Sequence, residues 1–408
     1  MKKLTKVMSI AAAGAVLFGM SACGNSNNGG GSNDSNVTLT VWGPSEDQAK
    51  SDSWLQTMEK NFEKANPNTK FTWKNAVVSE GDAGKKVKTD AKAAADVYMF
   101  ANDQLGTLKE SNAISELSDD AVKQVKEQNS DSVIQSVTGS DGKLYGVPFT
   151  GNTWFMYYNK SKFTSEDIKS LDTMLQKGKV TFPVSNSWYF PAFYMGNGGT
   201  MFGAKGTDAK AGVNFPDAAA VTAYLAKLVA NPNFSDDADG SGIAAVKAGK
   251  ADVFFSGTWD ASNAKEALGD NYAAAPAPSY TLNGKSVQIK PFSGSKAIAS
   301  NPNSKNPKWA SKFAAYLGSK EAQKAHYTMR SVVPSDKTLA DQADIKSDPA
   351  AIAQIETIEK YSVNQPTISA MNNFWEPATT FGKALSGKTV TESNAEAQTT
   401  SWLNSYKK

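Results

Sequence analysis

Few residues of this 408-residue chain could carry out covalent or metal chemistry. There is one cysteine, Cys23, and one histidine, His326, so a cysteine nucleophile and a Cys/His metal site are excluded by count. No G-x-S-x-G segment is present, and the glycines of GNGG at 196–199 lack the lysine of a phosphate loop. His326 lies in an expected helix, where we expect it to be exposed or to pack. We therefore expect no metal, no cofactor and no catalytic residue, although a carboxylate pair among the 40 acids stays open.

Flat aromatic side chains are the more promising chemical groups, because they offer large rigid surfaces for stacking. Trp42 ends the expected strand VTLTVW, and open α/β sheets bind ligands at the carboxyl ends of strands, although a core position fits equally well. Trp259 follows a Ser-Gly turn, which would turn its ring out of a buried strand. Trp375 precedes a proline near an expected helix start. Five other tryptophans are better explained by packing in the core or on the surface: Trp54, Trp73, Trp154, Trp309 and Trp402.

The elements that would position these rings alternate between strands and helices. Residues 37–42 alternate apolar residues with threonines, and apolar residues of 54–62 share one helical face. The short apolar runs at 94–100 and 251–257 suit strands buried in a parallel sheet, and 217–230 reads as an amphipathic helix. This alternation predicts an α/β protein with open, mainly parallel sheets covered on both faces.

Length and charge narrow the possibilities further. About 370 residues follow Val37, more than one core usually supports, so we expect two domains. The 43 basic and 40 acidic residues give a net charge of +3, which argues against a nucleic-acid ligand.

The N-terminus has the features of an export signal. Three lysines precede a short apolar run that is too short for a permanent membrane span. The run ends in Met20-Ser21-Ala22-Cys23, which resembles the lipobox of bacterial lipoproteins except that Met20 replaces the usual leucine. The resemblance implies a signal peptide at 1–22, lipidation at Cys23, and anchoring at the extracellular face of the cytoplasmic membrane. Residues 23–36, rich in Gly, Ser and Asn, would form a flexible linker. An ordinary secretory signal with an incidental cysteine is the alternative.

Seven segments resemble, in order, the extracellular solute-binding proteins of sugar ABC transporters, especially the maltose/maltodextrin-binding type. They are LTVWGP at 39–44, ADVYMFANDQLGTL at 95–108, GKLYGVPF at 142–149, MYYNKSKF at 156–163, GKADVFFSGTWDASN at 249–263, RSVVPS at 330–335 and ISAMNNFW at 368–375. Each segment alone is a weak signal, but their shared order along the chain is specific for the fold and the class.

The resemblance implies a two-lobed periplasmic-binding-protein-like fold, in which each lobe is an open, mainly parallel sheet flanked by helices. Three hinge crossings would join the lobes, near 148–152, 291–294 and 332–335. The N-terminal lobe would comprise 37–149 and 295–331, and the C-terminal lobe 150–292 and 334–408.

The resemblance also implies where a sugar would bind. Sugar rings present apolar C–H faces and hydroxyl rims, so their receptors combine aromatic platforms with fixed polar groups. The matching aromatic positions are Trp188 or its neighbour Tyr189, Trp259 and Trp375; of the adjacent pair we expect Trp188 to face the cleft. Trp42 is added from its strand-end position. Among the matching polar positions, Asp103 corresponds to an aspartate of the family. Gln104 and Asn152 stand where the best-known maltose receptor has charged residues. Glu46 or Asp47 could play a similar part to Asp103.

The expected function is that of a monomeric receptor, which captures maltose or maltooligosaccharides by domain closure and delivers them to the permease of an ABC importer. A receptor for a raffinose-type or β-linked oligosaccharide is one alternative. A secreted glycoside hydrolase is a second, since such enzymes also combine aromatic platforms with acids. A surface adhesin is a third, but it would not need hinged lobes.

Overall fold

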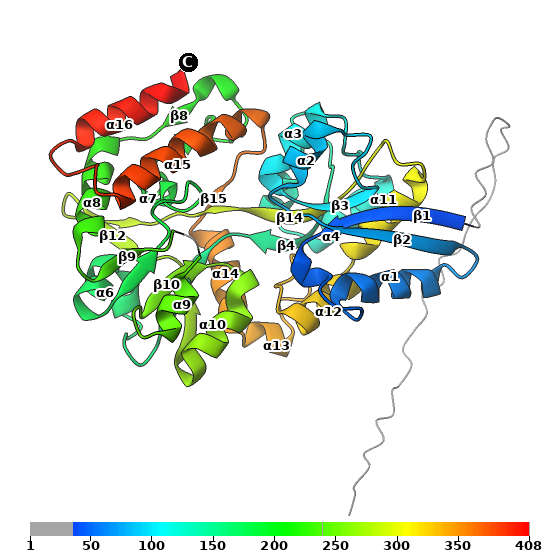
Figure 1. Cartoon of the computed structure of the whole chain (residues 1–408), viewed down its shortest axis with the longest axis horizontal. Coiled ribbons are helices and arrows are strands. Elements are labelled where there is room, and N and C mark those ends of the chain that lie inside the picture. Colours follow the sequence, from blue (N-terminus) through cyan, green and yellow to red (C-terminus); the bar gives the residue numbers. More distant parts are fainter. Residues whose placement is uncertain (1–35, 239, 408) are drawn as a thin grey trace, which may run out of the picture. The chain divides into compact units, whose positions relative to one another are not determined.

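A computed structural model describes residues 36–238 and 240–407, and Figure 1 shows the arrangement of their helices and strands. The predicted signal peptide, Cys23 and the linker up to residue 35 lie outside the described residues. Within the described residues, no helix has both the length and the apolar character needed to cross a membrane.

The first sheet has six strands in the order β15-β14-β3-β1-β2, with β4 also paired to β14. The pairs β1–β2 and β1–β3 are parallel, whereas β14 runs antiparallel to β3 and β4. The strands are β1 (Asn36–Gly43), β2 (Lys70–Val77), β3 (Val97–Ala101), β4 (Val147–Asn152), β14 (Phe292–Ser300) and β15 (Val363–Asn364).

Helices cover both faces of this sheet, which explains why all five residues of β3 are buried. Val97 and Met99 face a core shared with α1 (Trp54–Ala65), α11 (Pro307–Leu317) and α12 (Lys320–Arg330). Tyr98 and Phe100 face the opposite core. The helices contributing to this second core are α2 (Ala83–Thr89), α3 (Leu105–Glu110) and α4 (Asp119–Gln128), and α5 (Asp131–Ser136) follows α4.

The second sheet has five strands in the order β11-β5-β10-β6-β9. Here too alternate residues serve opposite cores: Phe255 packs in one and Phe254 in the other. The strands are β5 (Phe155–Asn159), β6 (Val180–Phe182), β9 (Phe234–Asp236), β10 (Val253–Ser256) and β11 (Tyr272–Ala275). The helices on the Phe255 side are α6 (Leu171–Lys177), α7 (Pro191–Gly196), α8 (Ala218–Ala230), α15 (Asn372–Ser386) and α16 (Ala395–Asn404); those on the Phe254 side are α9 (Gly242–Lys247), α10 (Ala261–Leu268) and α14 (Pro349–Lys360). The remaining α-helix and strands form small units. Strand β7 (Thr200–Met201) pairs with β8 (Val213–Asn214), β12 (Ser279–Leu282) pairs with β13 (Lys285–Gln288), and α13 (Ala343–Lys346) is a short helix.

The expected α/β architecture of two helix-covered sheets is confirmed, with more antiparallel pairing than the sequence predicted. In the two main sheets every antiparallel pair includes β5 or β14, the strands next to the first two predicted crossings. Strand β4 ends at Asn152, directly before β5 of the second sheet, and β14 brings the chain back. The predicted crossings lie side by side: Gly294 pairs with Asn152, and Thr150 pairs with Pro334. The exact lobe boundaries remain a prediction.

Trp54 ties α1 to α12 in the first core and provides a test of its packing. Its indole is fully buried, its Nε1 donates to the Ala322 carbonyl at 2.9 Å, and its ring stacks on His326 at 4.1 Å. Removing a buried indole costs about 3–5 kcal/mol, because the lost contacts leave a cavity. We expect Trp54→Ala to lower the free energy of urea unfolding by that amount, while Val77→Ala, at a 61% exposed side chain, changes it by less than about 0.5 kcal/mol. A loss below about 1 kcal/mol for Trp54→Ala would contradict this packing.

Candidate functional site: an aromatic groove beside the crossing strands

A groove of about 510 Å³ is lined by loops that follow strands of both sheets and by residues of the crossing strands β4 and β14. Its volume is within the range typical of small-molecule sites. Its lining combines indole rings with carboxylate, amide, hydroxyl and ammonium groups. The lining residues are Glu46, Glu80, Gly81, Ala101, Asp103, Gln104, Asn152, Ser187, Trp188, Trp259, Lys296, Gln365 and Trp375.

Three half-buried tryptophans form the aromatic wall of the groove. Trp188 and Trp259 lie 6.0 Å apart between ring centroids, tilted by 41°. The indole Nε1 of Trp188 donates to Gln365 Oε1 at 2.8 Å, which fixes the orientation of the ring. Trp375 packs edge-on against Phe292, at 6.0 Å, and against Phe374, at 5.5 Å. The rings of Trp188 and Trp375 are therefore held in place while part of each lines the groove.

Local sequence explains how two of these rings reach the groove. Trp259 lies in a 3₁₀ turn, Thr258–Asp260, directly after β10, and its ring packs on Gly257, where a Cβ would collide with it. The turn expected at Ser256-Gly257 lies one position later: Ser256 ends β10, Gly257 is extended, and the chain turns at Thr258–Asp260. Trp375 lies in the first turns of α15, as expected from its position near a helix start.

Asp103 supplies a carboxylate to the lining of the groove. It lies in the 3₁₀ turn Asn102–Gln104 after β3, and its Oδ2 accepts a 2.9 Å hydrogen bond from Gln104 Nε2. Burial raises the pKa of Asp103 to about 6, although hydrogen bonds from Gln104 and from the backbone act in the other direction. Asn152, at the end of β4, is only 7% exposed and adds an amide to the floor.

A charged pair borders one end of the groove. Lys296 Nζ lies 3.2 Å from Glu80 Oε1 and 5.3 Å from the ring centroid of Trp259. Beyond this pair the groove narrows to an extension of about 50 Å³ that also reaches Arg330. Glu80, Lys296, Ser187 and Gln365 were not identified from the sequence, because no local pattern marks them; Lys296 lies two residues beyond the predicted second crossing.

Three residues expected at the site do not line the groove. Trp42 points from β1 into the core of α2 and α3, with its ring 6.0 Å from Tyr98. Tyr189 is 9% exposed and stacks on Trp154 at 5.1 Å, so Trp188 is the member of the pair that faces the groove.

Asp47 is the third expected residue that does not line the groove, and its carboxylate contacts side chains of α12. It is 3% exposed, with Oδ1 2.9 Å from His326 Nε2 and 3.5 Å from Arg330 Nε. Burial acts to raise the pKa of Asp47, but His326 and Arg330 more than offset it and hold the pKa below its ordinary value. Asp47 borders only the narrow extension, whereas the neighbouring Glu46 lines the groove itself. His326 is a packing residue, as expected.

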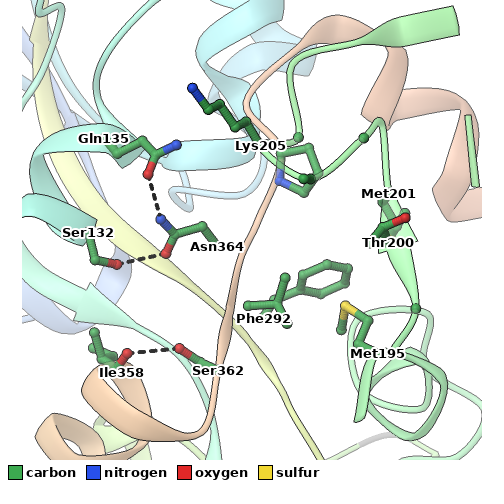
Figure 2. A pocket seen from close by; sticks show the side chains of 16 residues that line it. Ser132, Gln135, Met195, Thr200, Met201, Lys205, Phe292, Ile358, Ser362 and Asn364 are labelled. Atoms are coloured by element: carbon green, nitrogen blue, oxygen red, sulfur yellow. Dashed lines mark hydrogen bonds between the residues drawn. The ribbon is translucent and has the colours of Figure 1, made fainter. Parts of the chain in front are cut away.

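A larger cavity, of about 620 Å³, is lined in part by residues of the segment 362–366 (Figure 2). Asn364 faces this cavity and is held by Ser132, at 2.7 Å, and Gln135, at 3.0 Å, whereas the next residue, Gln365, lines the groove. Among the described residues lining this cavity there is no tryptophan or tyrosine. A ligand that requires flat aromatic stacking is therefore better suited to the groove. In the part of the chain that the structure describes, no cluster of three His, Cys, Asp or Glu side chains could hold a metal ion.

Comparison with known proteins assigns the family. Residues 57–353 match the family model described as bacterial extracellular solute-binding protein. The chain belongs to this family. It is a solute-binding protein and not an enzyme.

This solute-binding protein is similar to sugar receptors over nearly its whole length. The maltodextrin-binding protein MdxE of Bacillus subtilis (strain 168) is 30% identical over 96% of this chain and 95% of its own. A structure solved with acarbose is 45% identical, with a TM-score of 0.87, and covers 91% of this chain and 98% of that chain. The maltodextrin-binding protein of L. casei BL23, solved without ligand, is 28% identical, with a TM-score of 0.82, and covers 91% of this chain and 99% of that chain. These likenesses confirm the two-lobed periplasmic-binding-protein fold.

The raised pKa of Asp103 predicts a cost in stability for the solute-binding protein. Its folded pKa of about 6 exceeds the unfolded value of about 3.9, so its proton favours folding below about pH 4, and this contribution is lost as the pH rises through 6. At neutral pH the partly buried carboxylate of Asp103 is therefore destabilising. We expect Asp103→Asn to raise the free energy of unfolding by about 1–2 kcal/mol at neutral pH and by much less at about pH 4.

Urea unfolding of the ligand-free protein at both pH values measures this difference. Asp270→Asn is the matched control, because it removes an exposed carboxylate that does not line the groove. Equal stability of Asp103→Asn and the parent protein at neutral pH would show that the carboxylate is not penalised by burial.

Proposed function

We propose that this protein captures maltooligosaccharides and delivers them to the permease of an ABC importer. The observation that carries the proposal is the groove itself, whose lining combines the indoles of Trp188, Trp259 and Trp375 with the polar side chains of Asp103 and Asn152. The names of the relatives support the same ligand class, since they include a maltodextrin-binding protein at 30% identity and a structure with acarbose at 45% identity.

The chemistry of a glucose oligomer fits this wall. The C–H face of a pyranose ring gains dispersion contacts and loses little hydration when it lies on an indole. The hydroxyl rim requires acceptors, and a carboxylate such as that of Asp103 can accept two hydroxyl hydrogen bonds. Glu80 and Lys296 balance each other's charge, so the end of the groove that they border suits an uncharged ligand.

Delivery would use closure of the lobes about the paired crossings. The groove draws its lining from elements of both sheets, so a sugar held by both walls would favour the closed form. Ligand shifts the open–closed balance only as far as it prefers one state. The closed, loaded form would then be the one presented to the permease.

The predicted lipid anchor would keep the receptor near that permease. Lipidation of Cys23, with residues 23–36 as a tether, would hold the folded part at the extracellular face of the cytoplasmic membrane. Stable anchoring usually takes more than one acyl chain. This part of the proposal rests on the N-terminal sequence, and a monomeric state is proposed with it.

The sugar class is tested by titrating the purified protein with maltotriose, raffinose and a β-linked trisaccharide while recording intrinsic tryptophan fluorescence. We expect maltotriose to quench or shift the emission, because indoles line the site, and to be recovered uncleaved. A response to raffinose or the β-linked sugar in place of maltotriose would support another oligosaccharide. Cleaved sugar would contradict the receptor assignment.

The aromatic platform is tested by Trp259→Ala and Trp375→Ala, measured by isothermal titration calorimetry with maltotriose. We expect each to weaken binding about tenfold or more, equivalent to about 1.4 kcal/mol, because a stacking surface is lost. Trp42→Ala serves as the matched control: its ring is half-buried too but lies outside the groove, so affinity should be kept. Normal affinity in both groove variants would place the platform elsewhere.

A further inference from the structure

The narrow extension of the groove has walls from both halves of the protein. Asp47 and Arg330 border it on the side of the first sheet, and Thr258 and Trp259, in the turn after β10, border it on the side of the second. Its volume of about 50 Å³ is far below that of a typical ligand site. When the lobes close, side chains and not a ligand would therefore fill this gap.

Arg330 is the only arginine of the chain, and His326 is the only histidine. Both contact the same buried carboxylate. Asp47 Oδ1 lies 3.5 Å from Arg330 Nε and 2.9 Å from His326 Nε2. His326 is itself fixed, since its ring stacks on Trp54 at 4.1 Å and on Phe149 at 5.6 Å. The position of the Asp47 carboxylate is therefore well defined, and the carboxylate in turn holds the guanidinium of Arg330.

The guanidinium of Arg330 keeps donors available for a second contact. It carries five N–H groups in a planar fork, and only Nε faces Asp47. Within the residues that the structure describes, Arg330 forms no other ion pair, and its side chain is 31% exposed at the border of the extension. A lysine has a single donor nitrogen, so it could not contact Asp47 and a distant acceptor with separate nitrogens.

Thr258 offers an acceptor on the opposite wall of the extension. Its hydroxyl donates to Gln354 Oε1 at 2.9 Å, so the lone pairs of Thr258 Oγ1 remain able to accept. Thr258 begins the turn that also carries Trp259 of the groove. A hydrogen bond to Thr258 would therefore join the first half of the protein to an aromatic element of the second.

Arg330 also lies directly before the third predicted crossing. It ends α12, and Ser331 after it adopts a left-handed conformation with φ of 57°, which is costly for a residue other than glycine. Val332 follows and borders the extension. A movement of the lobes about the crossings would therefore take place next to the base of the Arg330 side chain.

We propose that Arg330 is a latch between the lobes. In the closed form its guanidinium donates across the extension to Thr258 Oγ1, while Asp47 keeps it in position. The proposal rests on the proposed function, since closure is part of that function. Arg330 would raise the affinity for sugar without touching the sugar, because it stabilises the closed form that the sugar prefers. Asp47 is then a positioning residue for the latch.

The consequence is a loss of affinity whenever either partner of the latch is removed. A hydrogen bond from a charged donor corresponds to about tenfold in affinity. We expect Arg330→Lys and Thr258→Val each to weaken maltotriose binding about tenfold, and the double variant to bind no more weakly than either, because one substitution already removes the contact. Arg330→Lys keeps a positive charge for Asp47, and Thr258→Ser keeps the hydroxyl and should bind maltotriose as the parent protein does.

Calorimetric titration of these variants with maltotriose measures the coupling. Thr328→Val is the matched control, because Thr328 is an exposed threonine of α12 that lines neither the groove nor the extension. A second readout uses the single arginine of the chain: in protein with isotope-labelled arginine, every guanidinium signal in the NMR spectrum belongs to Arg330. Maltotriose should shift these signals in the parent protein and in Thr258→Ser, and much less in Thr258→Val.

Three results would overturn the proposal. They are unchanged affinity in Arg330→Lys, losses in the two single variants that add up in the double variant, and guanidinium signals that maltotriose does not move. Additive losses would mean that Arg330 and Thr258 act separately, each through a contact of its own. Failure of the parent protein to bind any maltooligosaccharide would instead reject the proposed function, and the latch with it.

Discussion

The central constraint in this structure is that three large apolar rings remain partly uncovered in a polar groove and yet keep fixed orientations. Each ring is restrained by a contact distant in sequence: Trp188 by Gln365, Trp375 by Phe292, and Trp259 by the ammonium of Lys296. Trp259 also packs on nearby Gly257. Rings held in this way lose little conformational freedom when a ligand stacks on them. The aromatic wall is therefore preorganised by the fold as a whole.

The crossing strands make this arrangement possible, because they bring loops from both sheets to one place. Asn152 and Gly294 pair where β4 meets β14, and Gly294 is so close to Asn102 that a Cβ would collide with it. Thr150 Oγ1 donates to the Val333 carbonyl at 2.6 Å, which joins the third crossing to the first. On β15 and the residue after it, Asn364 lines the larger cavity and Gln365 lines the groove.

The sequence was most informative where one local feature determines both backbone and side-chain direction. The buried runs at 94–100 and 251–257 became β3 and β10, and the polar or aromatic residues directly after them, Asp103 and Trp259, line the groove. Trp42 shows the limit of the same rule. A position at the end of a strand determines which edge of the sheet a residue lies near. The alternation of side chains along the strand determines which face of the sheet its side chain lies on. The side chain of Trp42 lies on a face that helices cover.

The residues that sequence reasoning missed depend on long-range contacts. Glu80 and Lys296 are 216 positions apart and become a pair only when β14 pairs with β3, which places Lys296 opposite Ala101. Strand β15 has two residues, too few to show any periodicity, and Gln365 follows it. Asp47 was a reasonable candidate from its position after the first strand, but its carboxylate is occupied by His326 and Arg330 of a helix far along the chain.

The most direct measurement of the central claim is a crystal structure of the protein with bound maltotetraose. The account predicts pyranose C–H faces against the rings of Trp259 and Trp375, with hydroxyls on the carboxylate of Asp103. Density for the sugar in any other cavity, with the three indoles uncovered, would contradict it.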